Sequence, residues 1–293
     1  MIYNVKFRTC HLFIAVAIVS VIGALTMFFI KIRTMIETDK VILPSIDDVP
    51  AESWAKLAER KIFFGHKSVG YNIIDGIADI MNEHDYIKLN VVVGQEPTIF
   101  DLPVLAHSHV GMNMDPVSKI RSFMNIMDNG MGNKVDIAFF KFCYIDIMRD
   151  SDPQEIFNCY RAVFEELKNR YPDTKFLHIT VPICSVPKGI KRNLKQSIKL
   201  LIGMPGILED NMIRQAYNKL LRDAYSETEP FFDLALIESV NPNGFRCYAA
   251  KGTEKVYFMA PEYTDDGGHL NIQGRRKVAE QLLIILAETA SRS

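Results

Sequence analysis

The sequence has little excess charge and no repeated or low-complexity segment. Its 34 basic and 35 acidic residues leave a formal net charge of −1, so it lacks the basic excess typical of nucleic-acid-binding proteins, and we expect no nucleic-acid partner. Charged residues make up 24% of the chain, an ordinary share that argues against a disordered protein. A length of 293 residues suits one large domain or two small ones.

Cysteines are few and widely spaced, and no CxxC pair is present. The four cysteines after residue 31 are Cys143, Cys159, Cys184 and Cys247. In an exported domain they allow several disulfide pairings, and they are equally compatible with buried free thiols.

The long apolar run of the chain lies near its N-terminus. Residues 12–30 include no charged side chain, and as a helix they would extend roughly 28 Å, close to the thickness of the bilayer core. A buried core helix is seldom apolar on every face over this length. No small-x-small cleavage site follows Ile30, as would be expected after a signal peptide. The run predicts an uncleaved transmembrane anchor, with the tail and anchor together forming residues 1–31.

Basic residues flank this run on both sides, with Lys6 and Arg8 before it and Lys31 and Arg33 after it. Counting these basic residues by the positive-inside rule gives only a slight preference for one membrane orientation. A short N-terminal tail before a long domain is the usual signal-anchor arrangement. We therefore expect a single-pass membrane protein whose main domain lies on the extracytoplasmic side.

The rest of the chain alternates apolar strands with amphipathic helices. A polar tether is predicted at residues 32–58, before a domain at residues 59–293. The periodicity predicts strands at 61–65, 87–93, 135–142, 175–181 and 231–238, helices at 68–81, 116–127, 153–167, 209–226 and 271–290, a loop at 94–114 and a connection at 183–208. Five strands separated by helices predict an α/β protein, a three-layer α/β/α sandwich around a five-stranded parallel sheet. Ligands of such folds bind at the carboxyl ends of the strands.

Ser68 follows the first predicted strand and precedes a predicted helix. A serine in this place can be a nucleophile, because its backbone N–H and the helix dipole can stabilise an oxyanion. It can equally be a simple helix cap. The segment is not the G-x-S-x-G turn of α/β-hydrolases, because His66 occupies the first glycine position.

A second polar segment precedes the last predicted helix, where Asp266 and His269 are three residues apart. A carboxylate hydrogen-bonded to an imidazole fixes its tautomer, so that the imidazole can deprotonate a serine. The alternative is turn chemistry, with Asn271 capping the helix.

The two segments together resemble the SGNH/GDSL-type esterases and acyltransferases over about residues 60–290. The resemblance rests on the early strand–Ser–helix unit and on a D-x-x-H-x-N-x-x-G motif formed by Asp266, His269, Asn271 and Gly274. It implies a flavodoxin-like sheet of strand order 2-1-3-4-5. It also implies Ser68 as the nucleophile, His269 as the general base and Asp266 as its orienting partner, with no cofactor.

The sequence departs from this family in two of its motifs. The first usually reads G-D-S, whereas His66 and Lys67 separate Gly65 from Ser68. The third usually reads G-x-N-D and supplies an amide donor to the oxyanion, whereas residues 141–146 read KFCYID and contain no asparagine.

We therefore assign the oxyanion hole to Ser68, Gly111 and Asn113. The glycine matches the family's second motif, and Asn113 offers a replacement amide from the neighbouring loop. His66, Lys67 and Tyr144 are predicted to contribute to substrate binding.

A further motif, His107-Ser108-His109, has a spacing that can bind zinc. No convincing further ligands accompany it, so we interpret both histidines as solvent-facing loop residues and expect no metal.

Three functions fit these features. The first is a membrane-anchored serine hydrolase, an esterase or carbohydrate O-deacetylase, acting on an ester or an acylated glycan through an acyl-enzyme. The second is an O-acyltransferase that uses the same triad on a cell-surface polysaccharide. The third is a non-catalytic anchored binding or assembly protein of the same fold, which the missing third-motif asparagine favours.

Overall fold

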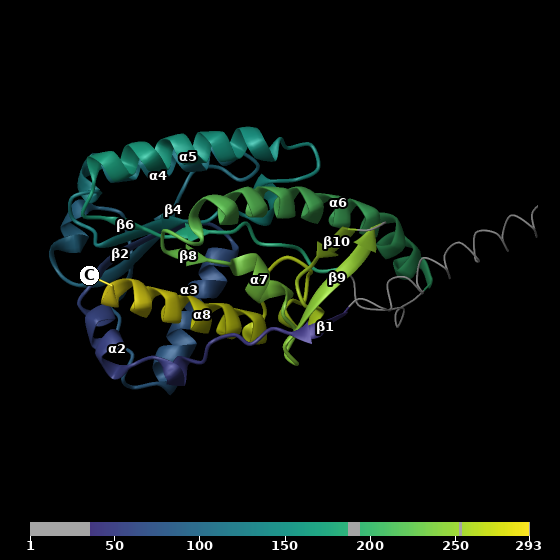
Figure 1. Ribbon diagram of the computed structural model, residues 1–293, viewed down its shortest axis with the longest axis horizontal. Helices are drawn as coiled ribbons and strands as arrows, with labels where there is room; N and C mark the ends of the chain where they lie inside the picture. The colour runs from purple at the N-terminus through teal and green to yellow at the C-terminus, as the bar shows by residue number, and fades with distance from the viewer. Residues whose placement is uncertain (1–35, 187–193, 252–253, 293) are drawn as a thin grey trace, which may run out of the picture.

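A computed structural model describes residues 36–186, 194–251 and 254–292 of the chain. Parallel strands form a central sheet, and helices cover both of its faces (Figure 1). The α/β class and the five-stranded parallel sheet predicted from the sequence are confirmed.

The central sheet is built around β2, whose residues after Lys61 are all buried. A continuous apolar strand such as this one is expected where helices cover both faces of a sheet. In spatial order the strands are β3 (Val91–Val93), β4 (Val104–His109), β2 (Lys61–His66), β5 (Ile137–Phe140) and β6 (Lys175–Phe176). One residue beyond β6, strand β7 (His178–Ile179) pairs in parallel with β8 (Phe231–Phe232).

Two apolar cores separate the sheet from its helical layers. Alternate residues of β2 point to opposite sides, so that Phe64 lies in one core and Phe63 in the other. On the side of Phe64 lie α2 (Ala51–Ala58), α3 (Val69–Glu83), α7 (Leu234–Ser239) and α8 (Ile272–Ser291). On the side of Phe63 lie α4 (Pro116–Ile126), α5 (Pro153–Arg170) and α6 (Leu194–Tyr225).

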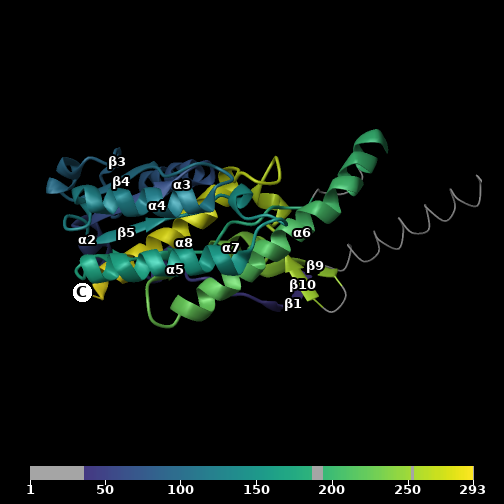
Figure 2. The same cartoon turned by 90° about the horizontal axis from the view of Figure 1, so that it is seen from above.

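A small antiparallel sheet, which the sequence did not predict, lies at one end of the molecule (Figures 1 and 2). Its order is β1 (Ile36–Lys40), β9 (Phe245–Lys251) and β10 (Glu254–Tyr257). β1 pairs with a strand more than 200 residues away in the chain, and local periodicity does not reveal such a pairing.

The second strand of the predicted order was misplaced. β4 lies within residues 94–114, which were predicted as a loop, and it is β4 that pairs with β2. Within the predicted strand 87–93, only Val91–Val93 forms a strand, and it pairs with β4 at the sheet edge. The polar sequence His107-Ser108-His109 is not typical of a buried strand. His107 is nevertheless buried, and in the folded structure its ring makes a hydrogen bond to His66.

Two other predicted boundaries are also wrong. Only Phe231–Phe232 of the predicted strand 231–238 is a strand, because Asp233 accepts a hydrogen bond from Leu236 N–H and begins α7. Residues 194–208, predicted as part of a connection, are helical and belong to α6.

Residues 36–58 fold onto the domain, so the prediction of a polar tether is wrong for this part of the chain. Trp54 and Leu57 of α2 are buried in the core that also contains α8. Gln281 of α8 donates a hydrogen bond to the carbonyl of Pro44. An amphipathic helix of eight residues buries its apolar face here because α8 offers a complementary surface.

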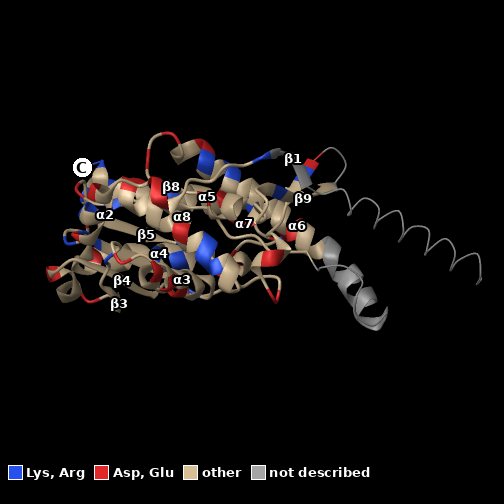
Figure 3. Ribbon diagram, turned by 90° about the horizontal axis from the view of Figure 1, so that it is seen from below, with Lys and Arg blue, Asp and Glu red and all other residues tan. Residues whose placement is uncertain are grey.

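Within the described residues, no helix combines the length and the apolar character needed to cross a bilayer. The predicted anchor at residues 12–30 lies outside the described residues. Lys and Arg are interspersed with Asp and Glu over the ribbon (Figure 3). Cys143, Cys159, Cys184 and Cys247 are free thiols.

Candidate active site

Ser68 lies in the turn between β2 and α3, at the carboxyl edge of the sheet. Its φ of 49° and ψ of −109° are unusual for a residue with a side chain, and such strain is concentrated at functional sites. Its side chain makes no capping hydrogen bond to α3. Instead, Oγ lies 2.6 Å from Nε2 of His269. The interpretation of Ser68 as a simple helix cap is therefore wrong.

His269 connects Ser68 to Asp266. Its Nδ1 lies 2.6 Å from Oδ2 of Asp266. An ionised carboxylate only accepts hydrogen bonds, so Nδ1 carries the hydrogen and Nε2 accepts one from the Ser68 hydroxyl. The structure thus brings together the three residues that the sequence predicted as a triad, in one chain of hydrogen bonds.

The Asp266 carboxylate is stabilised in its charged form. Burial opposes the charge, but the backbone N–H groups of His269 and Gly268 and the His269 imidazole hold the pKa of Asp266 well below its usual range. The side chains of His269 and Asp266 are 45% and 58% exposed. A solvent-borne substrate can therefore reach the imidazole.

Asn271 and Gly274, the other members of the terminal motif, fix the start of α8. Asn271 Oδ1 accepts a hydrogen bond of 3.0 Å from Gly274 N–H, and its Nδ2 donates to the carbonyl of Glu262. A Cβ on Gly274 would lie 2.4 Å from the carbonyl oxygen of Tyr263, so a side chain does not fit there. The motif therefore holds the loop that presents Asp266 and His269.

Gly111 and Asn113 follow β4, and Ser68 follows β2. These two strands are neighbours in register, with His66 opposite His109, so both loops leave the same edge of the sheet. Gly111 has a φ of 51°, and a Cβ on it would lie 2.5 Å from the backbone nitrogen of Lys119. Only glycine fits this position without strain. Asn113 is exposed, with its Oδ1 3.1 Å from Nζ of Lys119.

A buried ion pair behind this loop was not predicted from the sequence. Nζ of Lys119 lies 2.5 Å from Oδ2 of Asp146, and both side chains are fully buried. A lysine in the first turn of an amphipathic helix normally faces solvent, so no sequence pattern marked Lys119. The one signal was the aspartate of the third motif, Asp146, which the sequence retains.

The three predicted substrate-binding residues lie in different surroundings. His66 is fully buried, so the predicted direct contact with a substrate is wrong. Burial, with smaller contributions from Lys141, His107 and His109, lowers the pKa of His66 to about 2, so its ring is neutral. Lys67 is partly exposed next to Ser68.

Tyr144 is half-buried beside the triad. The centroid of its ring lies 5.9 Å from that of His269, in an edge-on arrangement. Arg214 donates a hydrogen bond from Nε to the Tyr144 carbonyl and so holds this segment against α6. A role for Lys67 and Tyr144 in substrate binding stays a prediction.

The interpretation of His107 and His109 as loop residues is wrong, because both lie in β4. His107 is buried, with Nδ1 2.9 Å from Nε2 of His66. His109 is exposed, with Nε2 2.9 Å from the hydroxyl of Tyr71. Within the described part of the chain, no group of three or more His, Cys, Asp or Glu side chains is arranged to hold a metal ion.

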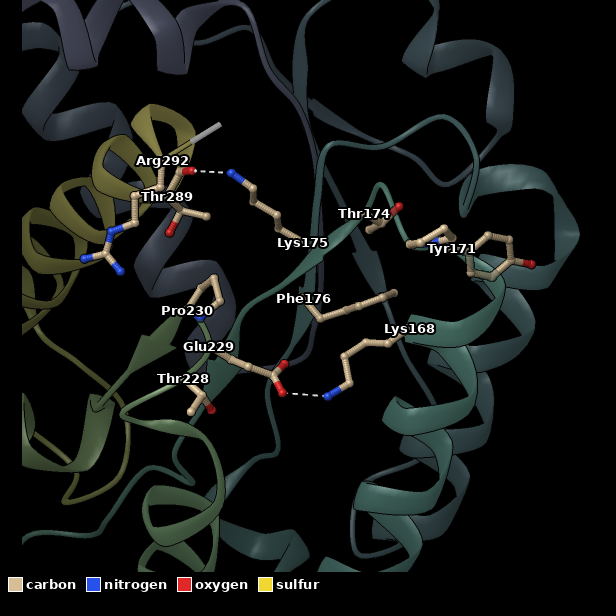
Figure 4. A pocket seen from close by; sticks show the side chains of 11 residues that line it. Lys168, Tyr171, Thr174, Lys175, Phe176, Thr228, Glu229, Pro230, Thr289 and Arg292 are labelled. Atoms are coloured by element: carbon tan, nitrogen blue, oxygen red, sulfur yellow. Dashed lines mark hydrogen bonds and ion pairs between the residues drawn. The ribbon is translucent and has the colours of Figure 1, made fainter.

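A cavity of about 400 Å³ lies at the opposite edge of the sheet, where β6 begins (Figure 4). It is lined in part by Lys168 and Glu229, which form an ion pair of 2.6 Å, and by Lys175, which donates to the Thr289 carbonyl. No residue of the Ser68–His269–Asp266 chain lines it.

Several solved structures are similar to this one. No family model matches the sequence, and no curated protein matches it. An acetyl xylan esterase has 17% identity and a TM-score of 0.40 over 76% of this chain and 97% of its own. A lipase/acylhydrolase from Enterococcus faecalis has 15% identity and a TM-score of 0.42 over 80% and 96%. The periplasmic domain of a lipopolysaccharide acetyltransferase from Salmonella ser. Paratyphi A has 10% identity and a TM-score of 0.37 over 75% and 80%. At such scores these likenesses leave the function to be argued from the site itself.

Proposed function

We propose that this chain is a membrane-anchored serine hydrolase that cleaves an ester, as an esterase or carbohydrate O-deacetylase. One observation carries the proposal: two hydrogen bonds of 2.6 Å join Ser68 Oγ, the His269 imidazole and the Asp266 carboxylate in series. A serine used only as a helix cap would turn its hydroxyl towards the backbone of α3. The strained backbone of Ser68 is a second supporting observation.

In the proposed reaction, Ser68 Oγ attacks the ester carbonyl carbon while His269 Nε2 takes the hydroxyl proton. The Asp266 carboxylate stabilises the imidazolium that forms. The carbonyl oxygen becomes an oxyanion, for which we assign as donors the backbone N–H groups of Ser68 and Gly111 and the side-chain amide of Asn113.

The tetrahedral intermediate then collapses by breaking the bond to the alcohol oxygen, which takes the proton from His269. The product is an acyl ester of Ser68. A water molecule, deprotonated by His269, attacks this ester in the same way and releases the carboxylic acid. Every proton is returned, so one ester and one water yield one alcohol and one acid.

The test is fluorophosphonate labelling of the full-length protein, combined with hydrolysis of p-nitrophenyl acetate and of an O-acetylated oligosaccharide. We expect labelling and hydrolysis in the wild type and the loss of both in Ser68→Ala. Ser226→Ala, which changes an exposed serine after α6, is the matched control and keeps both. Full hydrolysis by Ser68→Ala would refute the mechanism, and acetyl transfer to an added sugar that exceeds hydrolysis would identify an acyltransferase instead.

We also propose that residues 12–30 anchor the protein, with the domain on the extracytoplasmic side. The support is the uncharged run itself, flanked by basic residues. We expect the full chain in the membrane fraction, and protease added to intact spheroplasts to digest the domain. Protection of the domain from that protease would refute the orientation.

A further inference from the structure

Three strand-end loops meet at one buried ion pair. Asp146, in the loop after β5, accepts hydrogen bonds from Lys119 Nζ at 2.5 Å, from Cys143 N–H at 2.6 Å and from Met114 N–H at 2.9 Å. Lys119 belongs to α4, and Met114 belongs to the loop after β4. Cys143 Sγ in turn lies 3.7 Å from the carbonyl oxygen of Lys67, next to Ser68. The pair therefore connects the loops after β2, β4 and β5.

The Lys119 ammonium also determines how the amide of Asn113 is turned. An ammonium group carries only donors, so it pairs with an amide oxygen and never with an amide NH₂. Asn113 Oδ1 lies 3.1 Å from Nζ of Lys119 and accepts from it. The exposed Asn113 side chain therefore keeps its oxygen towards the protein interior and its N–H donors away from it. Without this contact, both ends of the amide would be free to face a substrate.

The position of the ammonium is itself fixed. Both side chains of the ion pair are fully buried, so neither can turn towards solvent. Asp146 is held by two backbone N–H groups in addition to Lys119, which leaves little freedom for the carboxylate. Gly111 packs directly on the backbone of Lys119, so the first helical turn and the loop after β4 are in close contact.

We infer that Lys119, fixed by Asp146, is a positioning residue that orients the Asn113 amide as a hydrogen-bond donor to the oxyanion. This inference rests on the proposed hydrolase function, and it deepens that function. The loop after β5 has no asparagine to supply such a donor. Asn113 supplies the amide from the loop after β4 instead. Asp146, in the loop after β5, supports it through Lys119.

Kinetics of four variants test the inference. Asn113→Ala should lower kcat by about 10²–10³-fold with little change in KM, as expected for the loss of one oxyanion donor. Lys119→Met should lower kcat by up to about 10²-fold through misplacement of the same donor. In the N113A background, K119M should cause almost no further loss, because its target is already gone. Lys134→Met, which removes the cation of an exposed ion pair with Asp101, is the control and keeps full activity.

Equal losses of kcat from K119M in the wild-type and N113A backgrounds would overturn the inference, because they would show a purely structural role. Full kcat in N113A would overturn it as well. If K119M alone folds poorly, the double variant Lys119→Met with Asp146→Asn removes both buried charges and takes its place. Thermal melts establish that each variant is folded before kinetics are measured.

A readout independent of catalysis separates this inference from the proposed function. In ¹⁵N-edited NMR spectra, the side-chain NH₂ protons of Asn113 should be well separated in the wild type and should move towards the values of a freely exposed asparagine in K119M. Unchanged signals in K119M would overturn the inference. Hydrolysis that survives in Ser68→Ala would refute the proposed function whatever these signals do.

Discussion

Removing one partner of the Lys119–Asp146 pair should destabilise the domain more than removing both. Lys119→Met leaves the Asp146 carboxylate fully buried with its two backbone donors and without its hydrogen-bonded cation. Breaking a buried pair in this way costs about 3–5 kcal/mol of unfolding free energy. For a domain of this size each kcal/mol lowers Tm by roughly 2–4 °C, so we expect a loss of about 10 °C.

The double variant Lys119→Met with Asp146→Asn should recover part of this loss. Met114 N–H donates to Oδ1 of Asp146 and Cys143 N–H donates to Oδ2, so the single amide oxygen of the asparagine keeps one of these donors and leaves the other without this partner, at a cost of ~1–3 kcal/mol. Removing both charges also removes the desolvation penalty of the pair. The double variant should therefore be more stable than Lys119→Met alone.

Urea unfolding followed by fluorescence and circular dichroism measures these differences. Lys134→Met, which breaks an ion pair whose side chains are 38% and 65% exposed, should change the unfolding free energy by less than about 1 kcal/mol. Additive losses in the double variant, or a Lys119→Met protein as stable as the wild type, would refute the reasoning.

Three further predictions concern the triad, the loop after β4 and acid stability. Asp266→Asn should lower kcat by about 10⁴-fold in ester hydrolysis while leaving Tm almost unchanged, and undiminished kcat would contradict the triad. Gly111→Ala should abolish hydrolysis because its Cβ meets the backbone of α4, whereas Gly130→Ala, at another left-handed glycine remote from the triad, should reduce Tm but keep kcat. Burial opposes the charge of Glu229, but His178 and Lys168 lower its pKa to about 2. The stability that the charged carboxylate contributes is therefore complete above about pH 4.5 and disappears towards pH 2. Between these pH values, the unfolding free energy measured in urea should depend less on pH in Glu229→Gln than in the wild type.

Local sequence patterns were sufficient to predict β2, α3, α5 and α8. β2 is a continuous apolar run, and α3, α5 and α8 each have an apolar stripe with a period of about 3.6 residues. In each case the pattern follows the residues that the fold buries. β4 escaped prediction because histidines occupy its end, and burial of His107 depends on His66, 41 residues earlier in the chain. β1 and α2 were missed because their partners, β9 and α8, come from the far end of the chain.

The sequence by itself determined which residues could form a triad. Ser68 after a strand, and Asp266 and His269 on one turn before the last helix, are local patterns whose chemistry follows from residue type and spacing. Whether Ser68 is a cap or a partner of His269 was open, because the two lie 201 residues apart. Only the packing of α3 beside α8 decided it, by bringing both loops to one edge of the sheet.

The surroundings of the triad were likewise decided only by the tertiary structure. Sequence placed His66 in contact with substrate, but the fold buries it under α3. Sequence gave no reason to single out Lys119, yet the fold buries it against Asp146 and Asn113. Spacing along the chain identifies groups that lie within one turn. Burial and the pairing of charges depend on contacts between distant elements, which no local pattern encodes.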